Sequence, residues 1–134
     1  MIMDKKQILV VDDEPNVLVT YRLILQQQGY AVNAAISPEE ARRCIDSVDL
    51  GLLLCDLSLE KQESGFDVIE YARKKFPDLP AVLLTGYATQ DANDWADARG
   101  IPVLFKPIDI QQLLETINNL LRNEGGSNAA KTNR

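Results

Sequence analysis

The chain has 134 residues, with 14 Lys and Arg against 20 Asp and Glu, so its formal net charge is −6. One domain of ordinary size accounts for this length, and it can fold without a disulfide or a structural metal. The acidic balance argues against direct binding of nucleic acid or of an anionic membrane, since both need a basic face. The sequence contains no His, which excludes His-based catalysis, His-ligated zinc and phosphohistidine relays within this polypeptide.

The cysteines and the apolar runs indicate in which cellular compartment the chain is expected. Cys44 and Cys55 show neither a disulfide framework nor a metal-ligand spacing, so we expect both to be reduced thiols. No apolar run approaches the roughly 18 residues of a membrane span, and residues 1–6 lack the apolar stretch of a signal peptide. The sequence therefore predicts a cytoplasmic chain.

Short apolar runs alternate with longer amphipathic segments along the chain. The runs are typical of strands of a parallel sheet that is buried on both faces. In chain order, the predicted strands are residues 8–11, 30–34, 50–55, 81–85 and 103–105. The predicted helices that follow them begin at residues 14, 37, 65, 91 and 109. Five strand-then-helix units predict an α/β domain built on a doubly wound, five-stranded parallel sheet with helices on both faces.

Capping residues mark the ends of several predicted helices. Pro15 suits a first helical turn, and Gly29 ends the first helix. Ser37 and Glu40 have the spacing of a capping box, and Asp109 caps the last helix. We expect the domain to span residues 6–123, with 1–5 as an N-terminal tail and 124–134 as a flexible tail or the remainder of a linker.

Polar residues follow or end four of the predicted strands. Asp12 and Asp13 follow the first strand, Asp56 the third and Lys106 the fifth, and Thr85 ends the fourth. In such a sheet ligands bind outside the carboxyl ends of the strands, so these side chains are expected to meet. Two carboxylates about 4 Å apart repel by about 4 kcal/mol at an effective dielectric near 20, and one lysine offsets only part of this. The pattern predicts a Mg²⁺ site that supports phosphoryl transfer to an Asp.

Each of these residues also has an ordinary explanation. Asp12 and Asp13 suit the N-terminus of a helix, Asp56 and Thr85 suit turns, and Lys106 suits a solvated strand end. Their position at the same end of several strands favours a reaction site over five separate coincidences.

Four segments of the chain resemble the receiver domain of two-component response regulators. In order they are Val10-Val11-Asp12-Asp13-Glu14-Pro15, Leu53-Leu54-Cys55-Asp56-Leu57, Leu83-Leu84-Thr85-Gly86-Tyr87 and Phe105-Lys106-Pro107. The resemblance covers residues 6–123. It implies a flavodoxin-like, chemotaxis-receiver-like fold with strand order 2-1-3-4-5.

The resemblance implies a phosphoacceptor and a metal site. Asp56 resembles the residue that takes a phosphoryl group from the phosphohistidine of a partner kinase. Asp13 resembles a direct Mg²⁺ ligand, and Asp12 a ligand that acts mostly through water. Ser58 resembles the position that lends a backbone carbonyl to the metal. We therefore expect the Mg²⁺ site to consist of Asp12, Asp13, Asp56 and Ser58.

The resemblance also implies how the phosphoryl group is sensed. Thr85 resembles the hydroxyl that turns toward the new group, and Lys106 resembles the lysine that pairs with it. Gly86 is expected to leave the acyl phosphate open to water or to a phosphatase. The bond between Lys106 and Pro107 is expected to be cis.

The chain departs from the family pattern at the expected switch. Val103 stands where an aromatic residue commonly lies, three residues before the lysine. We expect Phe105 to point to the opposite face of the sheet, and Tyr87 is a candidate substitute for the missing aromatic. The loop of residues 57–65 lacks the usual Pro and is one residue longer, and its acidic Glu60 and Glu63 are expected to tune metal access.

The sequence thus predicts a receiver domain that catalyses its own phosphorylation and dephosphorylation and switches a protein-interaction face. The expected partners are a sensor histidine kinase or phosphotransfer protein, and an output domain, an effector or a second copy bound to the face of the fourth helix, fifth strand and fifth helix. The main alternative is a pseudo-receiver that binds proteins without phosphorylation. An aspartyl-nucleophile phosphatase is disfavoured because Ser58 stands where its second acid is expected, and a flavodoxin-like cofactor binder because residues 12–15 form no phosphate cradle.

Overall fold

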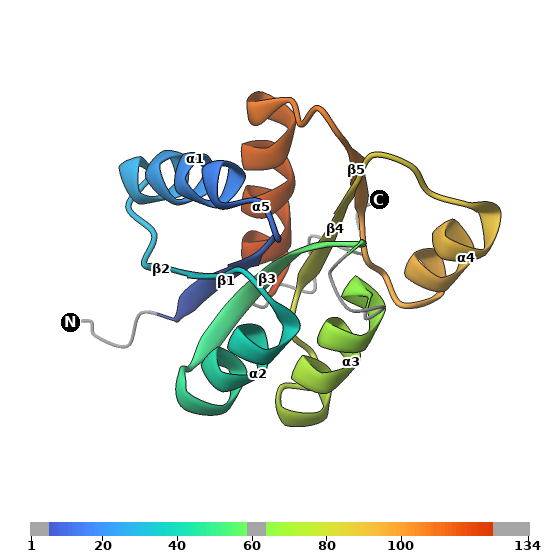
Figure 1. Ribbon diagram of the computed structural model, residues 1–134, viewed down its shortest axis with the longest axis horizontal. Helices are drawn as coiled ribbons and strands as arrows, with labels where there is room; N and C mark the ends of the chain where they lie inside the picture. The colour runs from blue at the N-terminus through green and yellow to red at the C-terminus, as the bar shows by residue number, and fades with distance from the viewer. Residues whose placement is uncertain (1–5, 59–63, 125–134) are drawn as a thin grey trace.

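The computed structural model describes residues 6–58 and 64–124, with side chains as far as residue 122. Five parallel strands form one sheet in the order β2-β1-β3-β4-β5, as Figure 1 shows. The strands are β1 (Gln7–Val11), β2 (Val32–Ala35), β3 (Leu50–Asp56), β4 (Ala81–Thr85) and β5 (Val103–Phe105). The helices are α1 (Pro15–Gln27), α2 (Pro38–Ser47), α3 (Gly65–Lys75), α4 (Gln90–Ala98) and α5 (Ile110–Glu124). The predicted α/β class and strand order are confirmed.

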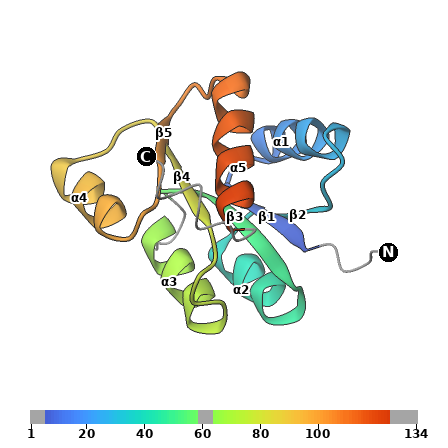
Figure 2. The same cartoon turned by 180° about the vertical axis from the view of Figure 1, so that it is seen from behind.

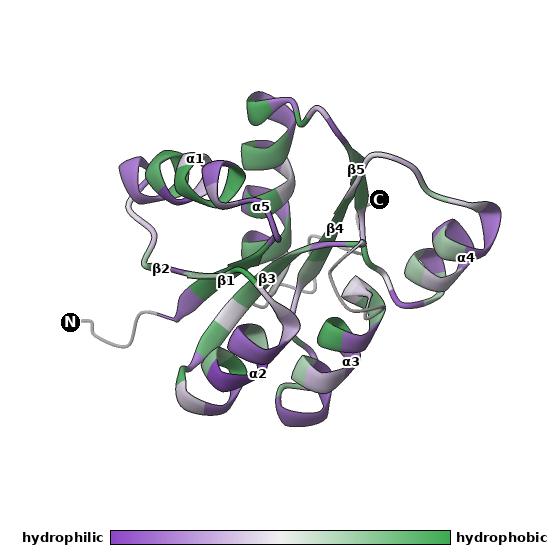
Figure 3. Ribbon diagram, viewed as in Figure 1, coloured by the Kyte–Doolittle hydropathy of each residue, from purple (hydrophilic) through white to green (hydrophobic). Residues whose placement is uncertain are grey.

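Two layers of helices enclose the sheet, with α1 and α5 on one face and α2 and α3 on the other (Figures 1 and 2). Successive strand residues point to opposite faces, so each strand contributes to two cores. In β1, Leu9 and Val11 pack with residues of α2 and α3, whereas Ile8 and Val10 pack with residues of α1 and α5. All seven residues of β3 are buried, and the hydropathy colouring in Figure 3 shows the apolar centre of the sheet.

The predicted caps of α2 and α5 are confirmed. The Ser37 hydroxyl accepts a hydrogen bond from the Glu40 N–H, and the Glu40 carboxylate accepts one from the Ile36 N–H. Asp109 accepts a hydrogen bond from the Gln112 N–H at the start of α5. Side-chain acceptors at these positions satisfy N–H groups that have no partner within the helix.

The start of β2 differs from the prediction. Gly29 has a φ of 94°, and the Tyr30 N–H donates to the carbonyl of Leu25. Tyr30 therefore belongs to the turn that closes α1, and the strand begins only at Val32. At the other end of the chain α5 continues to Glu124, one residue into the segment expected to be a tail.

Helix α4 lies beside the edge of the sheet and is anchored by a ring stack. Its buried residues are the small Ala92 and Ala96. Trp95 packs on Phe66 of α3 with ring centroids 4.2 Å apart. The Arg99 guanidinium lies over the Trp95 ring, 4.2 Å from its centroid. Trp95 therefore links α4 to α3 through a bulky apolar contact. Within the residues described, no helix is both long and apolar enough to cross a membrane.

Candidate functional site

The sheet register brings the predicted acidic residues together. β1 and β3 are neighbours, and Val11 pairs with Cys55, so the next residues along each strand, Asp12 and Asp56, lie side by side. Asp13 follows directly. One ligand atom from each of the three carboxylates lies within 4.8 Å of the others. The prediction that Asp12, Asp13 and Asp56 lie close together is confirmed.

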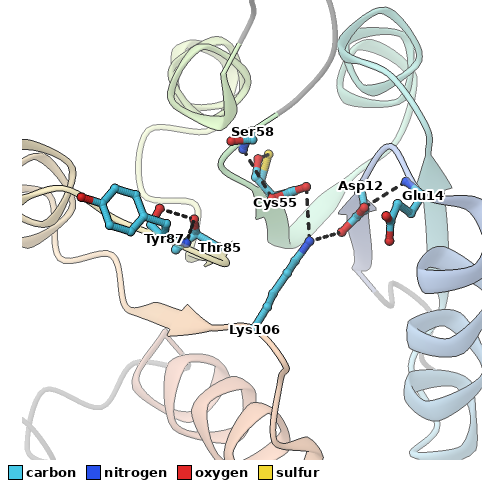
Figure 4. Close-up of polar contacts among 8 residues, drawn as sticks. Asp12, Glu14, Cys55, Ser58, Thr85, Tyr87 and Lys106 are labelled. Carbon is cyan, nitrogen blue, oxygen red and sulfur yellow. Dashed lines mark hydrogen bonds and ion pairs between the residues drawn. The ribbon is translucent and has the colours of Figure 1, made fainter.

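Burial makes this cluster electrostatically costly. Asp12 is fully buried, Asp56 is 6% exposed, and Asp13 is half-buried. The Glu14 N–H donates to Asp12 Oδ1 at 3.0 Å, which fixes the carboxylate plane at the start of α1 (Figure 4). A buried carboxylate without such partners would be strongly unfavourable.

Lys106 follows the edge strand β5 and contacts both buried carboxylates at the carboxyl edge of the sheet. Its Nζ lies 3.1 Å from Asp12 Oδ2 and 3.3 Å from Asp56 Oδ2. Figure 4 shows the side chain reaching from the end of β5 to this position. Its backbone N–H donates to the Thr85 carbonyl at 2.7 Å, and the Lys106–Pro107 bond is cis, as predicted.

One ammonium group does not balance three carboxylates. Burial and the neighbouring Asp12 carboxylate raise the pKa of Asp56, and Lys106 only partly opposes them. Burial alone would lower the pKa of Lys106, but its hydrogen bond to Asp12 and the charge of Asp56 outweigh burial and raise it. The site therefore keeps an excess of negative charge on oxygen atoms, a donor set that fits a hard divalent cation such as Mg²⁺.

The predicted sensing hydroxyl is bonded within its own loop. Thr85 is 3% exposed, and its hydroxyl donates to the Tyr87 carbonyl at 2.7 Å while accepting from the Tyr87 N–H at 3.1 Å. Figure 4 shows this pair to one side of the carboxylates. For Thr85 to bond a group on Asp56, its hydroxyl must give up the Tyr87 carbonyl.

Ser58 contacts the site through its N–H group. This N–H donates to Asp56 Oδ1 at 3.4 Å, and the Ser58 side chain is exposed. The predicted role of its carbonyl in metal binding stays a prediction. Glu60 and Glu63, which were expected to tune metal access, lie outside the described residues.

Gly65 is a structural determinant of the site that the sequence analysis did not identify. A Cβ at this position would overlap the backbone oxygen of Asp56 and crowd Leu57. The Gly65 N–H also donates to the Leu57 carbonyl at 2.8 Å. Only a residue without a side chain lets α3 start this close to the strand that ends in Asp56. The sequence signal for this requirement is a Gly at the first position of the predicted helix that follows Asp56.

The expectation that Phe105 points away from the face of Val103 is wrong. The two residues are two positions apart on β5, and residues at that spacing share a face of a strand. They pair with Leu83 and Thr85, which are likewise two apart on β4. Val103 packs against the core under α2 and α3, whereas Phe105 is 53% exposed.

The comparisons with known proteins agree with this geometry. The sequence model of the response regulator receiver domain matches residues 8–118, a stretch that contains every residue of the site. The chain belongs to this family of receiver domains. The carboxylate cluster is therefore part of a receiver domain of the kind found in two-component response regulators.

Individual regulatory proteins show the same likeness in sequence. The chain is 29% identical over 121 residues to the response regulator protein PilR of Pseudomonas aeruginosa, covering 90% of this chain and 27% of PilR. It is 33% identical over 108 residues to the alginate biosynthesis transcriptional regulatory protein AlgB of the same species, covering 80% of this chain and 24% of AlgB. The chain thus spans about a quarter of the length of these relatives.

A solved receiver domain has the same fold. The CheY-like response regulator receiver domain protein from Methanospirillum hungatei superimposes with a TM-score of 0.84 at 29% identity. The superposition covers 91% of this chain and 98% of that protein. The present chain therefore shares its fold with this solved receiver domain.

Proposed function

We propose that this receiver domain accepts a phosphoryl group on Asp56 from a sensor histidine kinase or a phosphotransfer protein, with Mg²⁺ bound. The observation that carries the proposal is the position of the Asp56 carboxylate. It lies at the end of β3, within the three-carboxylate cluster, and 3.3 Å from the Lys106 ammonium. A nucleophilic carboxylate, a cation and further oxygen ligands are the groups that phosphoryl transfer to an Asp needs.

The transfer is a single displacement at phosphorus. An Asp56 oxygen forms a bond to the phosphorus of the donor's phosphohistidine. The P–N bond breaks, its electron pair stays on the imidazole nitrogen, and an acyl phosphate remains on Asp56. Asp12, Asp13 and Asp56, with the Ser58 carbonyl, are the residues that would hold Mg²⁺, which neutralises charge on the phosphoryl oxygens. Lys106 is placed to pair with those oxygens because its Nζ already contacts Asp56.

Dephosphorylation completes the cycle. Water attacks the acyl phosphate and releases inorganic phosphate, so the domain returns to its resting form by its own chemistry. Gly86 is exposed, and a Cβ at this position would meet no atom within 4 Å. This open surface next to Thr85 leaves room for water or for a phosphatase.

Phosphorylation then acts as a switch. The phosphoryl group adds a charge of about −1.5 to −2 and strong acceptor oxygens. Thr85 exchanges the Tyr87 carbonyl for one of these oxygens, which draws the start of the α4 segment toward Asp56 and shifts the α4–β5–α5 face between two arrangements. A shift from 1:99 to 99:1 needs about 5.5 kcal/mol of differential stabilisation. In this proposal the shifted face binds an output domain, an effector protein or a second copy, and the domain acts in the cytoplasm.

Labelling with acetyl phosphate tests the proposal. The chain is incubated with acetyl phosphate and Mg²⁺ and its intact mass is measured, for the wild type, Asp56→Asn and the exposed control Asp49→Asn. We expect one phosphoryl adduct on the wild type and on Asp49→Asn, and none on Asp56→Asn or in excess EDTA. Absence of any adduct, while a known receiver domain labels in parallel, would replace this proposal with the pseudo-receiver.

A further inference from the structure

A groove of about 360 Å³ lies between α3 and α4, which Figures 1 and 2 both show as neighbours. Residues of both helices line this α3–α4 groove, and they are Ile69, Glu70, Arg73, Lys74, Trp95 and Arg99. Residues four positions apart share a side of a helix, so each helix presents a stripe to the groove. A different side of α4 carries Asp94 and Asp97, which line a separate hollow against β5.

The groove offers apolar surface at its base. Ile69 is almost fully buried there. The partly exposed Trp95 ring is fixed by its packing on Phe66, with ring centroids 4.2 Å apart. The aliphatic stems of the Lys and Arg side chains around the ring add to this apolar surface.

The rim of the groove is basic, although the chain as a whole has a net charge of −6. Arg73, Lys74 and Arg99 line the groove, against Glu70 as the one carboxylate among its described lining residues. The Glu70 carboxylate lies 3.9 Å from Arg99 Nη2 and both side chains are exposed, so this pair neutralises little. Burial and the charge of Arg99 lower the pKa of Arg73, and Asp78 only partly opposes them. The electrostatic complement of the groove is therefore an anion.

Both guanidinium groups are held in place before any ligand binds. Arg73 donates from Nε and Nη2 to the Leu79 carbonyl at 3.0 and 2.8 Å, and from Nη1 to the Arg99 carbonyl at 3.2 Å. Arg73 thus ties α3 to the end of α4 and sets the width of the groove. The Arg99 guanidinium lies over the Trp95 ring and donates from Nη1 to the Trp95 carbonyl at 3.0 Å. Side chains that are already ordered lose less conformational entropy when they bind a partner.

We infer that the α3–α4 groove binds an acidic segment of a partner protein, whose Asp or Glu carboxylate pairs with Lys74 and Arg99 and whose apolar side chain packs on Trp95. Trp and Arg are the residue types that most often dominate binding energy at protein interfaces. A second copy of the chain is a poor occupant, because two chains of net charge −6 repel each other. Nucleic acid is disfavoured for the same reason, since its phosphates would approach an acidic protein. The inference goes beyond the proposed function, because no residue of the carboxylate cluster lines the groove.

Trp95 is the single Trp of the chain, so its fluorescence reports directly on the groove. Random 12-residue peptides displayed on phage are selected on the full chain with Mg²⁺. Synthetic copies of the selected peptides that lack Trp are then titrated while the Trp95 emission is followed. We expect peptides that combine Asp or Glu with Leu, Ile or Phe and that change this emission. Their affinity should fall as the NaCl concentration rises, because salt screens exposed charges.

Charge-reversal variants locate the binding site. Isothermal titration calorimetry should show that the peptides bind Lys74→Glu/Arg99→Glu about tenfold more weakly than the wild type. Lys74→Glu alone leaves the contact of Arg99 with Trp95 intact and should weaken binding about threefold. The control Arg22→Glu/Arg43→Glu makes the same change in net charge at exposed positions of α1 and α2, and it should bind within about twofold of the wild type.

Four results would each overturn the inference: no enrichment of acidic peptides, binding without a change in Trp95 emission, equal weakening by both double variants, and tighter binding of a DNA oligonucleotide than of the peptides. A dimer in sedimentation that Lys74→Glu/Arg99→Glu disrupts would also overturn it, in favour of a second copy. Asp56→Asn should bind the peptides as the wild type does. Loss of phosphoryl labelling and loss of peptide binding are therefore separate results, and either can occur without the other.

Discussion

Replacing Lys106 by Met lowers the free energy of unfolding of the metal-free chain by about 2–3 kcal/mol. Lys106 Nζ contacts both Asp12 and Asp56, and Met keeps the aliphatic stem while removing the charge. Breaking a fully buried ion pair costs about 3–5 kcal/mol. The Lys106 side chain is 28% exposed, so solvent screening reduces the expected loss. Urea unfolding at pH 7 in EDTA measures it.

Two comparisons make the Lys106 result specific. Lys74→Met, at an exposed position of α3, should change stability by less than about 0.5 kcal/mol. Adding Asp56→Asn to Lys106→Met should restore part of the loss of stability, since one unpaired carboxylate is then gone.

The stability deficit of Lys106→Met should also depend on pH. The folded-state pKa of Asp56 is already raised, so protonation of Asp56 relieves the repulsion and the deficit should shrink as the pH falls from 7 toward 5. A deficit that is independent of pH and of Asp56 would contradict the ion-pair explanation.

The second large effect is expected from Gly65→Ala, which should lower the free energy of unfolding by about 1–3 kcal/mol. The added Cβ would overlap the Asp56 backbone oxygen, and backbone atoms of a buried strand end cannot rotate away as a long side chain can. The start of α3 and the end of β3 must therefore separate. The measurement is urea unfolding followed by circular dichroism.

Gly86→Ala is the matched control for Gly65→Ala. A Cβ at Gly86 meets no atom within 4 Å, so stability should stay within about 0.5 kcal/mol of the wild type. Because the clash at Gly65 involves the residue that carries the nucleophile, Gly65→Ala should also slow labelling by acetyl phosphate under conditions where the variant is folded. Equal stability of the two alanine variants would show that the close packing at Gly65 is not required.

The parts of the fold that depend on local pattern could be predicted from the sequence. β4 and β5 have the expected bounds because apolar runs between turn residues define buried strands. The convergence of Asp12, Asp56 and Lys106 also followed, since parallel strands place their carboxyl ends at one edge. Ser37 and Asp109 cap their helices as expected because a cap involves only residues within one turn.

The parts that depend on tertiary contact could not be predicted in this way. The bond of Thr85 to Tyr87 depends on the path of one loop, and the requirement for Gly65 depends on how closely α3 approaches the end of β3. The late start of β2 follows from the turn at Tyr30, which a strand-like sequence does not reveal. The orientation of Phe105 was predictable, because a period of two places it on the face of Val103.

The most direct test of the central claim is to locate the phosphoryl group. After labelling with acetyl phosphate and Mg²⁺, borohydride reduces an aspartyl phosphate to homoserine, which peptide mass spectrometry places in the sequence. The account predicts homoserine at position 56 alone. Homoserine at Asp12 or Asp13, or a stable phosphoester on Ser58 or Thr85, would contradict it.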